Sequence, residues 1–244
     1  MKTLEDDSID LIVTSPPYGV GKEYEKDVGQ DEYSYMVDAA SKEFKRVLKP
    51  DGRFACNVPF TMNHNNALVL VMHEWMTAFL KNGLNIRDII IWNQSNSGND
   101  TAWGSFKSAS SPWLRHQCEG IVVGFKDQWK KIKKGESDIT RDEFMKYVVD
   151  LWSMPCARHK EHPAVFSEEL PYRCVKLFSY VGDVVLDPFC GTGTTLLIAK
   201  QLGRNCIGID RSKKYCDITK ERIGFFQATL NDSVKFIYNT VNGD

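Results

Sequence analysis

Long apolar runs, paired cysteines and an excess of charge are all missing from this sequence. Its apolar stretches, such as residues 67–72 and 89–92, are far shorter than the roughly 18 residues that a membrane span needs. Residues 1–10 are acidic and contain no signal-peptide stretch, so we expect a cytoplasmic protein with no membrane partner. The seven cysteines include no Cys-x-x-Cys pair, which favours free thiols over disulfides or a structural zinc site.

The balance of charge narrows the classes of partner. Lys and Arg number 31 and Asp and Glu number 32, giving a formal net charge of −1. This balance excludes a protein that coats nucleic acid over its whole surface, but it allows a local basic face. The five histidines are scattered without the spacing of metal ligands, so we expect no metal site.

Apolar runs and helical patterns alternate along the chain. Residues 93–111 are expected to form a long polar loop, residues 49–52 a turn, and residues 126–147 an amphipathic segment at most. The alternation predicts one α/β domain built on a doubly wound, Rossmann-like parallel sheet with helices on both faces. Strands are expected at 9–13, 53–58, 87–92, 119–125, 184–187, 205–210 and 234–241, and helices at 31–48, 66–81, 166–179, 193–202 and 212–226.

A glycine-rich turn links the strand at 184–187 to the next helix. It reads Asp187-Pro-Phe-Cys-Gly191-Thr-Gly193-Thr, and its glycines let the backbone approach a ligand at a helix N-terminus. Position 196 is Leu and no Lys follows Gly193, so neither the Gly-x-Gly-x-x-Gly nor the Walker A pattern is present. Asp210 ends the following strand, where a carboxylate accepts hydrogen bonds from ribose hydroxyls. The turn predicts a nucleoside-containing cofactor; the alternative is a tight turn without a ligand.

The second motif, Ser15-Pro16-Pro17-Tyr18, ends the first predicted strand. Two prolines make this loop rigid, because neither fits a central strand. The Ser15 hydroxyl and the Pro16 carbonyl could accept hydrogen bonds from an exocyclic amino group, which frees the nitrogen lone pair for attack. Tyr18 offers a flat face on which an extruded base stacks. The alternative is a stiff loop with a packed tyrosine.

Together the two motifs resemble the amino-directed DNA methyltransferases, specific for cytosine N4 or adenine N6, in the β arrangement, where the catalytic motif precedes the cofactor motif. Residues 49–54, 162–171 and 208–211 are similar to further family segments, in the same order. The resemblance covers most of the chain. It implies an S-adenosylmethionine-dependent enzyme that methylates a flipped base in double-stranded DNA. The residues that it places in catalysis are Ser15, Pro16, Pro17 and Tyr18.

The resemblance also implies a set of cofactor contacts. Asp210 is expected on the ribose, and the glycine-rich turn along the methionine and ribose parts of the cofactor. Cys190 is expected to be a small packing residue in that turn. The full set is Asp187, Pro188, Phe189, Cys190, Gly191, Gly193, Thr194, Asp210, Arg211, His162, Phe166 and Asp244.

One family strand is missing from its usual place. Relatives of this arrangement carry, before the catalytic strand, a strand that ends in Gly-Asp and contacts the cofactor adenine. In this chain the segment that ends in Gly243-Asp244 lies after both cofactor units. We hypothesise a circular permutation, in which residues 234–241 supply the missing strand and Asp244 the adenine contact. The alternative is an ordinary C-terminal strand on a truncated relative.

The middle of the chain is the expected DNA-reading surface. Between Gly104 and Lys134, seven basic residues outnumber two acidic ones, an excess suited to phosphate contacts. The alternative for Lys130–Lys134 is a solvated turn. We expect residues 1–92 to form the catalytic half, 93–160 the target-recognition insertion and 161–244 the cofactor half. The expected DNA contacts are Ser105, Lys107, Ser108, Arg115, His116, Lys130 and Lys131.

The target base is predicted from a single residue. In this family a serine at the first motif position occurs more with cytosine, so Ser15 favours cytosine N4, with adenine N6 as the alternative. An RNA or protein-glutamine N-methyltransferase, and an inactive DNA-binding relative, are further alternatives. Cytosine C5 methyltransferases attack the ring through a cysteine thiolate, but such a mechanism through Cys156 is disfavoured. In the C5 family the cofactor motif precedes the catalytic motif, whereas here it follows. The resemblance leaves open a homodimer and a cognate restriction endonuclease.

Overall fold

The computed structural model describes residues 1, 3–18, 30–64, 67–94, 104–112, 114, 116–155, 167–224 and 234–238. Its helices are α1 (Gln30–Val47), α2 (Val71–Lys81), α3 (Arg141–Tyr147), α4 (Glu169–Phe178), α5 (Thr194–Gln201) and α6 (Lys213–Arg222). Its strands are β1 (Ile9–Thr14), β2 (Leu48–Pro59), β3 (Met62–His64), β4 (Ala67–Val69), β5 (Asn85–Asn93), β6 (Cys118–Phe125), β7 (Leu151–Ser153), β8 (Val184–Asp187), β9 (Asn205–Asp210) and β10 (Val234–Tyr238). Among the described residues, no helix combines the length and the apolar character needed to cross a bilayer.

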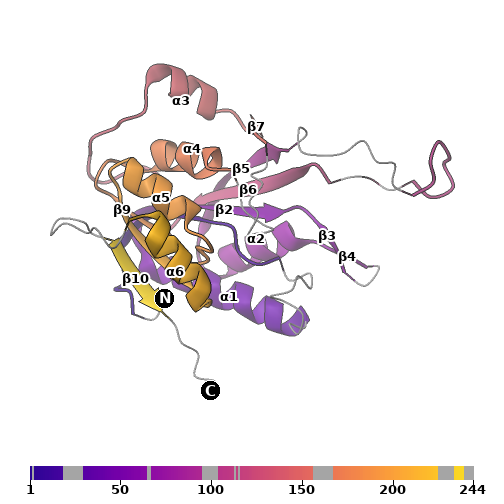
Figure 1. Cartoon of the computed structure of the whole chain (residues 1–244), viewed down its shortest axis with the longest axis horizontal. Coiled ribbons are helices and arrows are strands. Elements are labelled where there is room, and N and C mark those ends of the chain that lie inside the picture. The colour runs from indigo at the N-terminus through magenta and orange to yellow at the C-terminus, as the bar shows by residue number, and fades with distance from the viewer. Residues whose placement is uncertain are drawn as a thin grey trace.

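The main sheet has eight strands in the order β10-β9-β8-β1-β2-β6-β5-β7 (Figure 1). The strands from β10 to β2 all run parallel to one another, as predicted. The expectation of a wholly parallel sheet is wrong at β6, which runs antiparallel to both β2 and β5. The physical reason is the connection: the described residues between β5 and β6 include no crossover helix, and adjacent strands joined without a crossover are antiparallel.

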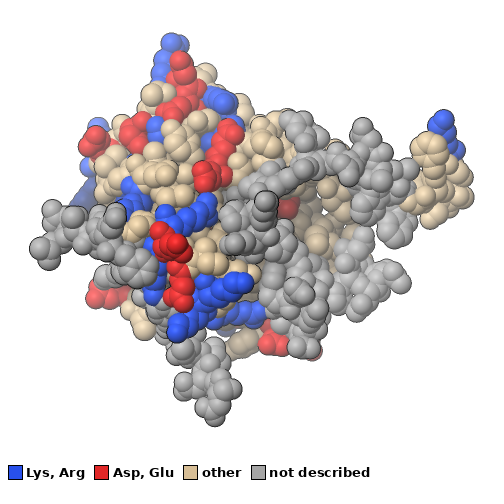
Figure 2. All heavy atoms as spheres, in the orientation of Figure 1, with Lys and Arg blue, Asp and Glu red and all other residues tan. Residues whose placement is uncertain are grey.

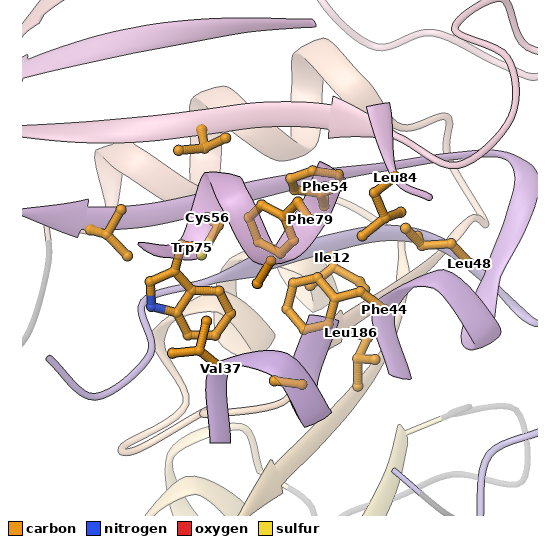
Figure 3. Close-up of a cluster of buried hydrophobic side chains, with 14 of the residues drawn as sticks. Ile12, Val37, Phe44, Leu48, Phe54, Cys56, Trp75, Phe79, Leu84 and Leu186 are labelled. Atoms are coloured by element: carbon orange, nitrogen blue, oxygen red, sulfur yellow. The ribbon is translucent and has the colours of Figure 1, made fainter. Parts of the chain in front are cut away.

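Side chains alternate across the central strands and so build a core on each face of the sheet. Ile12 of β1 faces the cluster formed with α1 and α2, whereas Leu11 and Val13 face the cluster formed with α3, α4 and α5. Figure 3 shows the first cluster, in which rings from α1, α2 and β2 meet. Its fully buried aromatic side chains include Phe44, Phe54, Trp75 and Phe79, and each such burial contributes about 1.5–3 kcal/mol.

Some predicted boundaries differ from the structure, and two short elements were not predicted. Residues 49–52 belong to β2 and do not form a separate turn, and the pairing of β1 with β2 shifts register between Ile9 and Leu11 to accommodate them. The helix expected at 66–81 begins only at Val71, because the preceding residues pair as the small β3–β4 hairpin. Helix α3 and strand β7 were not predicted; Thr140 and Glu143 form a capping box that starts α3.

The predicted C-terminal strand joins the main sheet. Strand β10 runs parallel to β9, with Val234 opposite Cys206 and Tyr238 opposite Asp210. The circular-permutation hypothesis requires a strand at this edge, next to the second cofactor strand, and β10 meets that requirement for residues 234–238. The proposed adenine contact, Asp244, lies outside the described residues. The cysteines in the described part of the chain are free thiols, as predicted.

Candidate active site

The two sequence motifs meet at the carboxyl ends of β1 and β8. These strands pair in parallel, with Leu11 opposite Val185 and Ile12 opposite Leu186. At their ends the Thr14 hydroxyl donates a hydrogen bond of 2.7 Å to Asp187 Oδ1, and both residues are buried. The loop Ser15–Tyr18 and the glycine-rich turn therefore leave the sheet side by side. This edge of a parallel sheet is where α/β folds bind ligands.

Asp187 organises the start of the glycine-rich turn. Its Oδ1 also accepts a hydrogen bond of 3.1 Å from the backbone N–H of Phe189. Burial raises the pKa of Asp187 to about 6, although the hydrogen bonds from Thr14 and Phe189 oppose that rise. The Phe189 ring meets Trp75 of α2 edge to face, with ring centroids 6.5 Å apart. Asp187 thus fixes the direction in which the turn leaves β8.

The glycines of the turn have the conformations that the motif predicts. Gly191 and Gly193 have φ values of 49° and 79°, in the left-handed region that favours glycine. A Cβ at Gly193 would lie 2.2 Å from Cγ2 of Thr219 in α6, so no larger residue fits. The Thr219 hydroxyl donates to the Gly191 carbonyl at 2.8 Å. The turn is therefore held against α6, with Gly193 immediately before α5.

Asp210 lies at the end of β9 and faces the same turn. Its Oδ2 accepts a hydrogen bond of 2.9 Å from Gly191 N–H, and its Oδ1 accepts one of 2.7 Å from Ser212 N–H. Each carboxylate oxygen has a further lone pair, so the group retains acceptor capacity for ribose hydroxyls. A close backbone approach at two glycines and an acceptor at the next strand end fit a nucleoside cofactor such as S-adenosylmethionine.

The other predicted cofactor residues fall into three groups. Pro188 lies in the turn, and Arg211 is exposed just after β9. Thr194 and Cys190 are buried. The Thr194 hydroxyl accepts a hydrogen bond from Arg222 at 3.1 Å, and Cys190 packs in the cluster formed with α3, α4 and α5, next to Gly208. The packing role expected for Cys190 is thus confirmed, and its side chain belongs to the core. His162, Phe166 and Asp244 lie outside the described residues, as does Cys156.

The catalytic motif takes part in a hydrogen-bonded cluster with two residues that the sequence did not reveal. Ser15 Oγ lies 3.0 Å from the Tyr18 hydroxyl, which donates to Glu119 Oε2 at 3.1 Å. Asn57 Nδ2 donates to the same Glu119 oxygen at 2.6 Å. Asn57 interrupts the apolar run of β2 and Glu119 is an acid within the basic stretch; these were the available signals. Pro16 is buried and Pro17 half-buried, consistent with a rigid loop.

The environment of Tyr18 keeps its hydroxyl protonated. Burial raises the pKa of Tyr18 well above its usual value, and the negative charge of Glu119 acts in the same direction. The phenol is therefore a neutral hydrogen-bond donor. Its hydroxyl is anchored toward Ser15 and Glu119, an arrangement that the stacking prediction did not anticipate.

The predicted DNA contacts separate into two locations. Residues 104–112 form a segment that projects away from the sheet, closed by a bridge between Gly104 and Pro112 (Figure 1). Lys107 and Ser108 are exposed on it, and His116 is exposed further along the chain. The Ser105 hydroxyl is engaged within this segment, donating to Ser108 O at 2.7 Å. Figure 2 shows basic atoms at the tip of the projecting segment. Arg115 lies outside the described residues.

Lys131 lies at the opposite end of β1 and β8 from the Ser15 loop, a position that does not fit the DNA contact predicted for it and for its neighbour Lys130. Lys131 Nζ is 3.4 Å from the carbonyl of Asp10 at the start of β1 and 3.7 Å from the Asp183 carboxylate just before β8. Its side chain is only 8% exposed, and burial lowers its pKa. Contacts of the neighbouring Trp129 hold these residues in place, because the Arg53 guanidinium stacks on the Trp129 ring and donates a hydrogen bond of 2.8 Å to the Trp129 carbonyl. Lys130, the preceding residue, is exposed.

Comparison with known proteins agrees with this geometry. A family model described as DNA methylase, for N6 and N4 methyltransferases, matches residues 9–221. The chain is 41% identical over 161 residues to the type II methyltransferase M.MjaVI of Methanocaldococcus jannaschii, covering 65% of this chain and 82% of that protein. It is 27% identical over 282 residues to M.MjaI of the same organism, covering 97% of this chain and 93% of that protein.

Solved structures show the same architecture. A putative DNA modification methylase of Thermus thermophilus, TTHA0409, is 25% identical and superposes with a TM-score of 0.76, covering 97% of this chain and 94% of that one. The same protein complexed with S-adenosyl-L-methionine superposes with a TM-score of 0.73. The cytosine-N4-specific PvuII DNA methyltransferase, at 20% identity and a TM-score of 0.71, covers 94% of this chain and 83% of that chain and shares the fold. The chain therefore belongs to the DNA methylase family, the N6- and N4-amino methyltransferases that use S-adenosylmethionine.

Proposed function

We propose that this chain methylates the exocyclic amino group of a base turned out of double-stranded DNA, with cytosine N4 as the favoured atom. The observation that carries the proposal is the hydrogen bond from Thr14 to Asp187. It joins the ends of the two strands from which the catalytic loop and the cofactor turn emerge. A target nitrogen bound at Ser15–Tyr18 would then lie next to the methyl donor.

The proposed chemistry follows from what the catalytic loop offers. When bound, S-adenosylmethionine supplies a methyl group activated by an adjacent sulfonium. The amino nitrogen of a base is a poor nucleophile, because its lone pair is delocalised into the ring. The Ser15 hydroxyl and the Pro16 carbonyl accept hydrogen bonds from the amino hydrogens, which favours a pyramidal nitrogen and stabilises its developing positive charge. Pro17 keeps these acceptors in place.

We assign the cofactor to the turn after β8. Gly191 and Gly193 allow close backbone approach, Asp187 fixes the turn, and Asp210 accepts from the ribose. Phe189 and Pro188 would line the same site, with Arg211 at its exposed margin. The contacts expected from His162, Phe166 and Asp244 remain part of the proposal.

The DNA surface is assigned to the part of the target-recognition insertion, residues 93–160, that precedes β6. Lys107, Ser108 and His116 are exposed there and were predicted to meet DNA. Arg115 completes the proposed set. Lys107 would contact phosphate, which positions the duplex without reading its sequence. Residues 1–92 and 161–244 are then the catalytic and cofactor halves of one domain.

The choice of base rests on Ser15 alone, so it needs a direct test. The protein is incubated with labelled S-adenosylmethionine and duplex DNA of mixed sequence, and the product is digested to nucleosides for mass analysis. N4-methyl-2′-deoxycytidine is the expected product. Detection of N6-methyl-2′-deoxyadenosine would instead make adenine N6 the target and leave the rest of the proposal unchanged.

The same assay with RNA and protein offered as substrates beside duplex DNA separates the remaining alternatives. Label found in RNA or in protein glutamine, with none in duplex DNA, would overturn the DNA assignment. No transfer to any substrate, with intact cofactor binding, would identify an inactive relative. The residues assigned to the site come from one chain, so the proposed chemistry requires neither a homodimer nor a cognate endonuclease. Light scattering at assay concentration measures whether the protein is a dimer.

A further inference from the structure

The tyrosine of the catalytic loop contacts a carboxylate from another strand. Glu119, near the start of β6, accepts hydrogen bonds at Oε2 from the Tyr18 hydroxyl and from Asn57 Nδ2. Tyr18 in turn lies 3.0 Å from Ser15 Oγ. These contacts form a continuous chain from Ser15 through Tyr18 to Glu119. Neither Glu119 nor Asn57 belongs to the Ser-Pro-Pro-Tyr motif.

The direction of each hydrogen bond in this chain follows from the chemistry of its members. An ionised carboxylate only accepts, so the Tyr18 hydroxyl donates its one hydrogen to Glu119. The contact between Tyr18 and Ser15 must then have Ser15 as the donor. With its own hydrogen committed to Tyr18, Ser15 Oγ presents only lone pairs to a substrate. Amino hydrogens require an acceptor of this kind.

Asn57 fixes the position of the carboxylate. It is 1% exposed, and only its amide nitrogen can lie 2.6 Å from a carboxylate oxygen, because two acceptors at that distance would repel. The same nitrogen is 3.4 Å from both Ser15 Oγ and the Tyr18 hydroxyl. Residues from three strands or their ends thus form this hydrogen-bonded series, since Ser15 follows β1, Asn57 lies in β2 and Glu119 lies in β6.

We propose that Glu119 is a positioning residue for methyl transfer: acting through Tyr18, it makes Ser15 a hydrogen-bond acceptor, and it takes the proton that the methylated nitrogen releases. This inference rests on the proposed function. As the N–C bond forms, the nitrogen becomes positively charged and gives a proton to Ser15 Oγ. Ser15 passes its own hydrogen to Tyr18, and Tyr18 passes its hydrogen to Glu119. The product nitrogen ends neutral and Glu119 ends as a carboxylic acid.

The first test is Glu119→Gln, which preserves shape and removes the charge, with the exposed Glu136→Gln as the matched control. The single-turnover rate of methyl transfer should fall roughly 10²-fold, the range expected for loss of proton-transfer assistance. The dissociation constants for S-adenosylmethionine and DNA should change less than about threefold. Glu136→Gln should retain the wild-type rate. An unchanged rate in Glu119→Gln would overturn the inference, as would a loss explained entirely by weaker binding of cofactor or DNA.

The second test asks whether Glu119 acts through Tyr18. Tyr18→Phe removes the linking hydroxyl, so Tyr18→Phe and the double variant Tyr18→Phe/Glu119→Gln should both be about as slow as Glu119→Gln. If the two losses multiply in the double variant, Glu119 acts independently and the relay is wrong. If Glu119→Gln fails to fold, Tyr18→Phe alone decides, because an unchanged rate would exclude the relay. Failure of the proposed function is recognised separately, since the wild-type protein would then transfer no methyl group to DNA.

Discussion

The Thr14 hydroxyl donates a 2.7 Å hydrogen bond to the Asp187 carboxylate, although the two residues lie 173 positions apart in the chain. Both are buried at adjacent strand ends. This one bond connects the segment that presents Ser15 to the segment that presents the glycine-rich turn. Its contribution can be measured by substitution.

Replacing Thr14 by Val should remove the bond and keep the shape of the side chain. The Asp187 carboxylate would lose a buried donor, which costs about 1–3 kcal/mol of unfolding free energy. Methyl transfer should fall as well, because the two loops lose their shared anchor. Chemical denaturation and a transfer assay measure both effects, with Thr14→Ser, which keeps the hydroxyl, as the control. Equal stability of Thr14→Val and wild type would show that the bond contributes nothing.

The raised pKa of Asp187 predicts a dependence of stability on pH. Its pKa moves from an ordinary 3.8 to about 6 in the folded protein. Between these values the folded state binds the proton and the unfolded state does not, so stability falls as the pH rises through this window. The fall should be about 3 kcal/mol, at about 1.4 kcal/mol per pKa unit.

The measurement for Asp187 is a difference between two proteins. Urea denaturation of wild type and Asp187→Asn at pH 4, 5, 6 and 7 isolates this carboxyl, because other titrating groups contribute equally to both. The wild-type stability relative to Asp187→Asn should decline from pH 4 to pH 6 and then level. A relative stability that rises over this range would contradict the assignment.

Two glycines with the same backbone conformation form a matched pair for the cofactor turn. Gly193 and Gly182 have φ values of 79° and 82°, but a Cβ at Gly193 would collide with Thr219, whereas one at Gly182 would meet nothing within 4 Å. Gly182→Ala should cost only the backbone strain, about 1 kcal/mol. Gly193→Ala should cost more and weaken S-adenosylmethionine binding at least tenfold, as measured by calorimetry. Similar affinities in the two variants would exclude a tight fit at Gly193.

Pro16→Ala should separate catalysis from cofactor binding. Pro16 is buried in the catalytic loop and remote in sequence from the cofactor turn. Loosening the loop should lower the rate of methyl transfer by about 10²-fold, since small misplacements of positioned groups have effects of that size. The affinity for S-adenosylmethionine should be retained. A parallel loss of cofactor affinity would undercut the separate roles assigned to the two loops.

Alanine substitution of Lys107 should affect DNA binding, whereas alanine substitution of Lys131 should affect stability. Lys107 is exposed on the projecting segment, so Lys107→Ala should weaken DNA binding similarly for all sequences and reduce the salt dependence by about one phosphate contact. Lys131 is nearly buried between Asp10 and Asp183, so Lys131→Ala should lower stability and leave the salt slope unchanged. Fluorescence titrations at several salt concentrations, together with melting curves, distinguish the two effects.

Local signals predicted much of the fold and both motif loops. Apolar runs such as Val184–Asp187, followed by glycine or proline, gave the central strands and the loops that end them, because these residues restrict the backbone directly. The direction of β6 and the start of α2 were missed. Both depend on which segments pair as strands, and the apolar pattern of a segment does not specify its partner.

The sequence by itself determined the chemistry that the chain carries: rigid acceptors in Ser15–Tyr18, a close backbone approach at Gly191 and Gly193, and an acid at Asp210. Those properties belong to side chains and backbone angles that act locally. Only the tertiary structure decided that Glu119 and Asn57 contact the Ser15–Tyr18 loop, and that Lys131 lies at the opposite end of β1 and β8 from this loop. Contacts between distant segments depend on strand order and register, and a basic or acidic residue has the same appearance in the sequence wherever the sheet carries it.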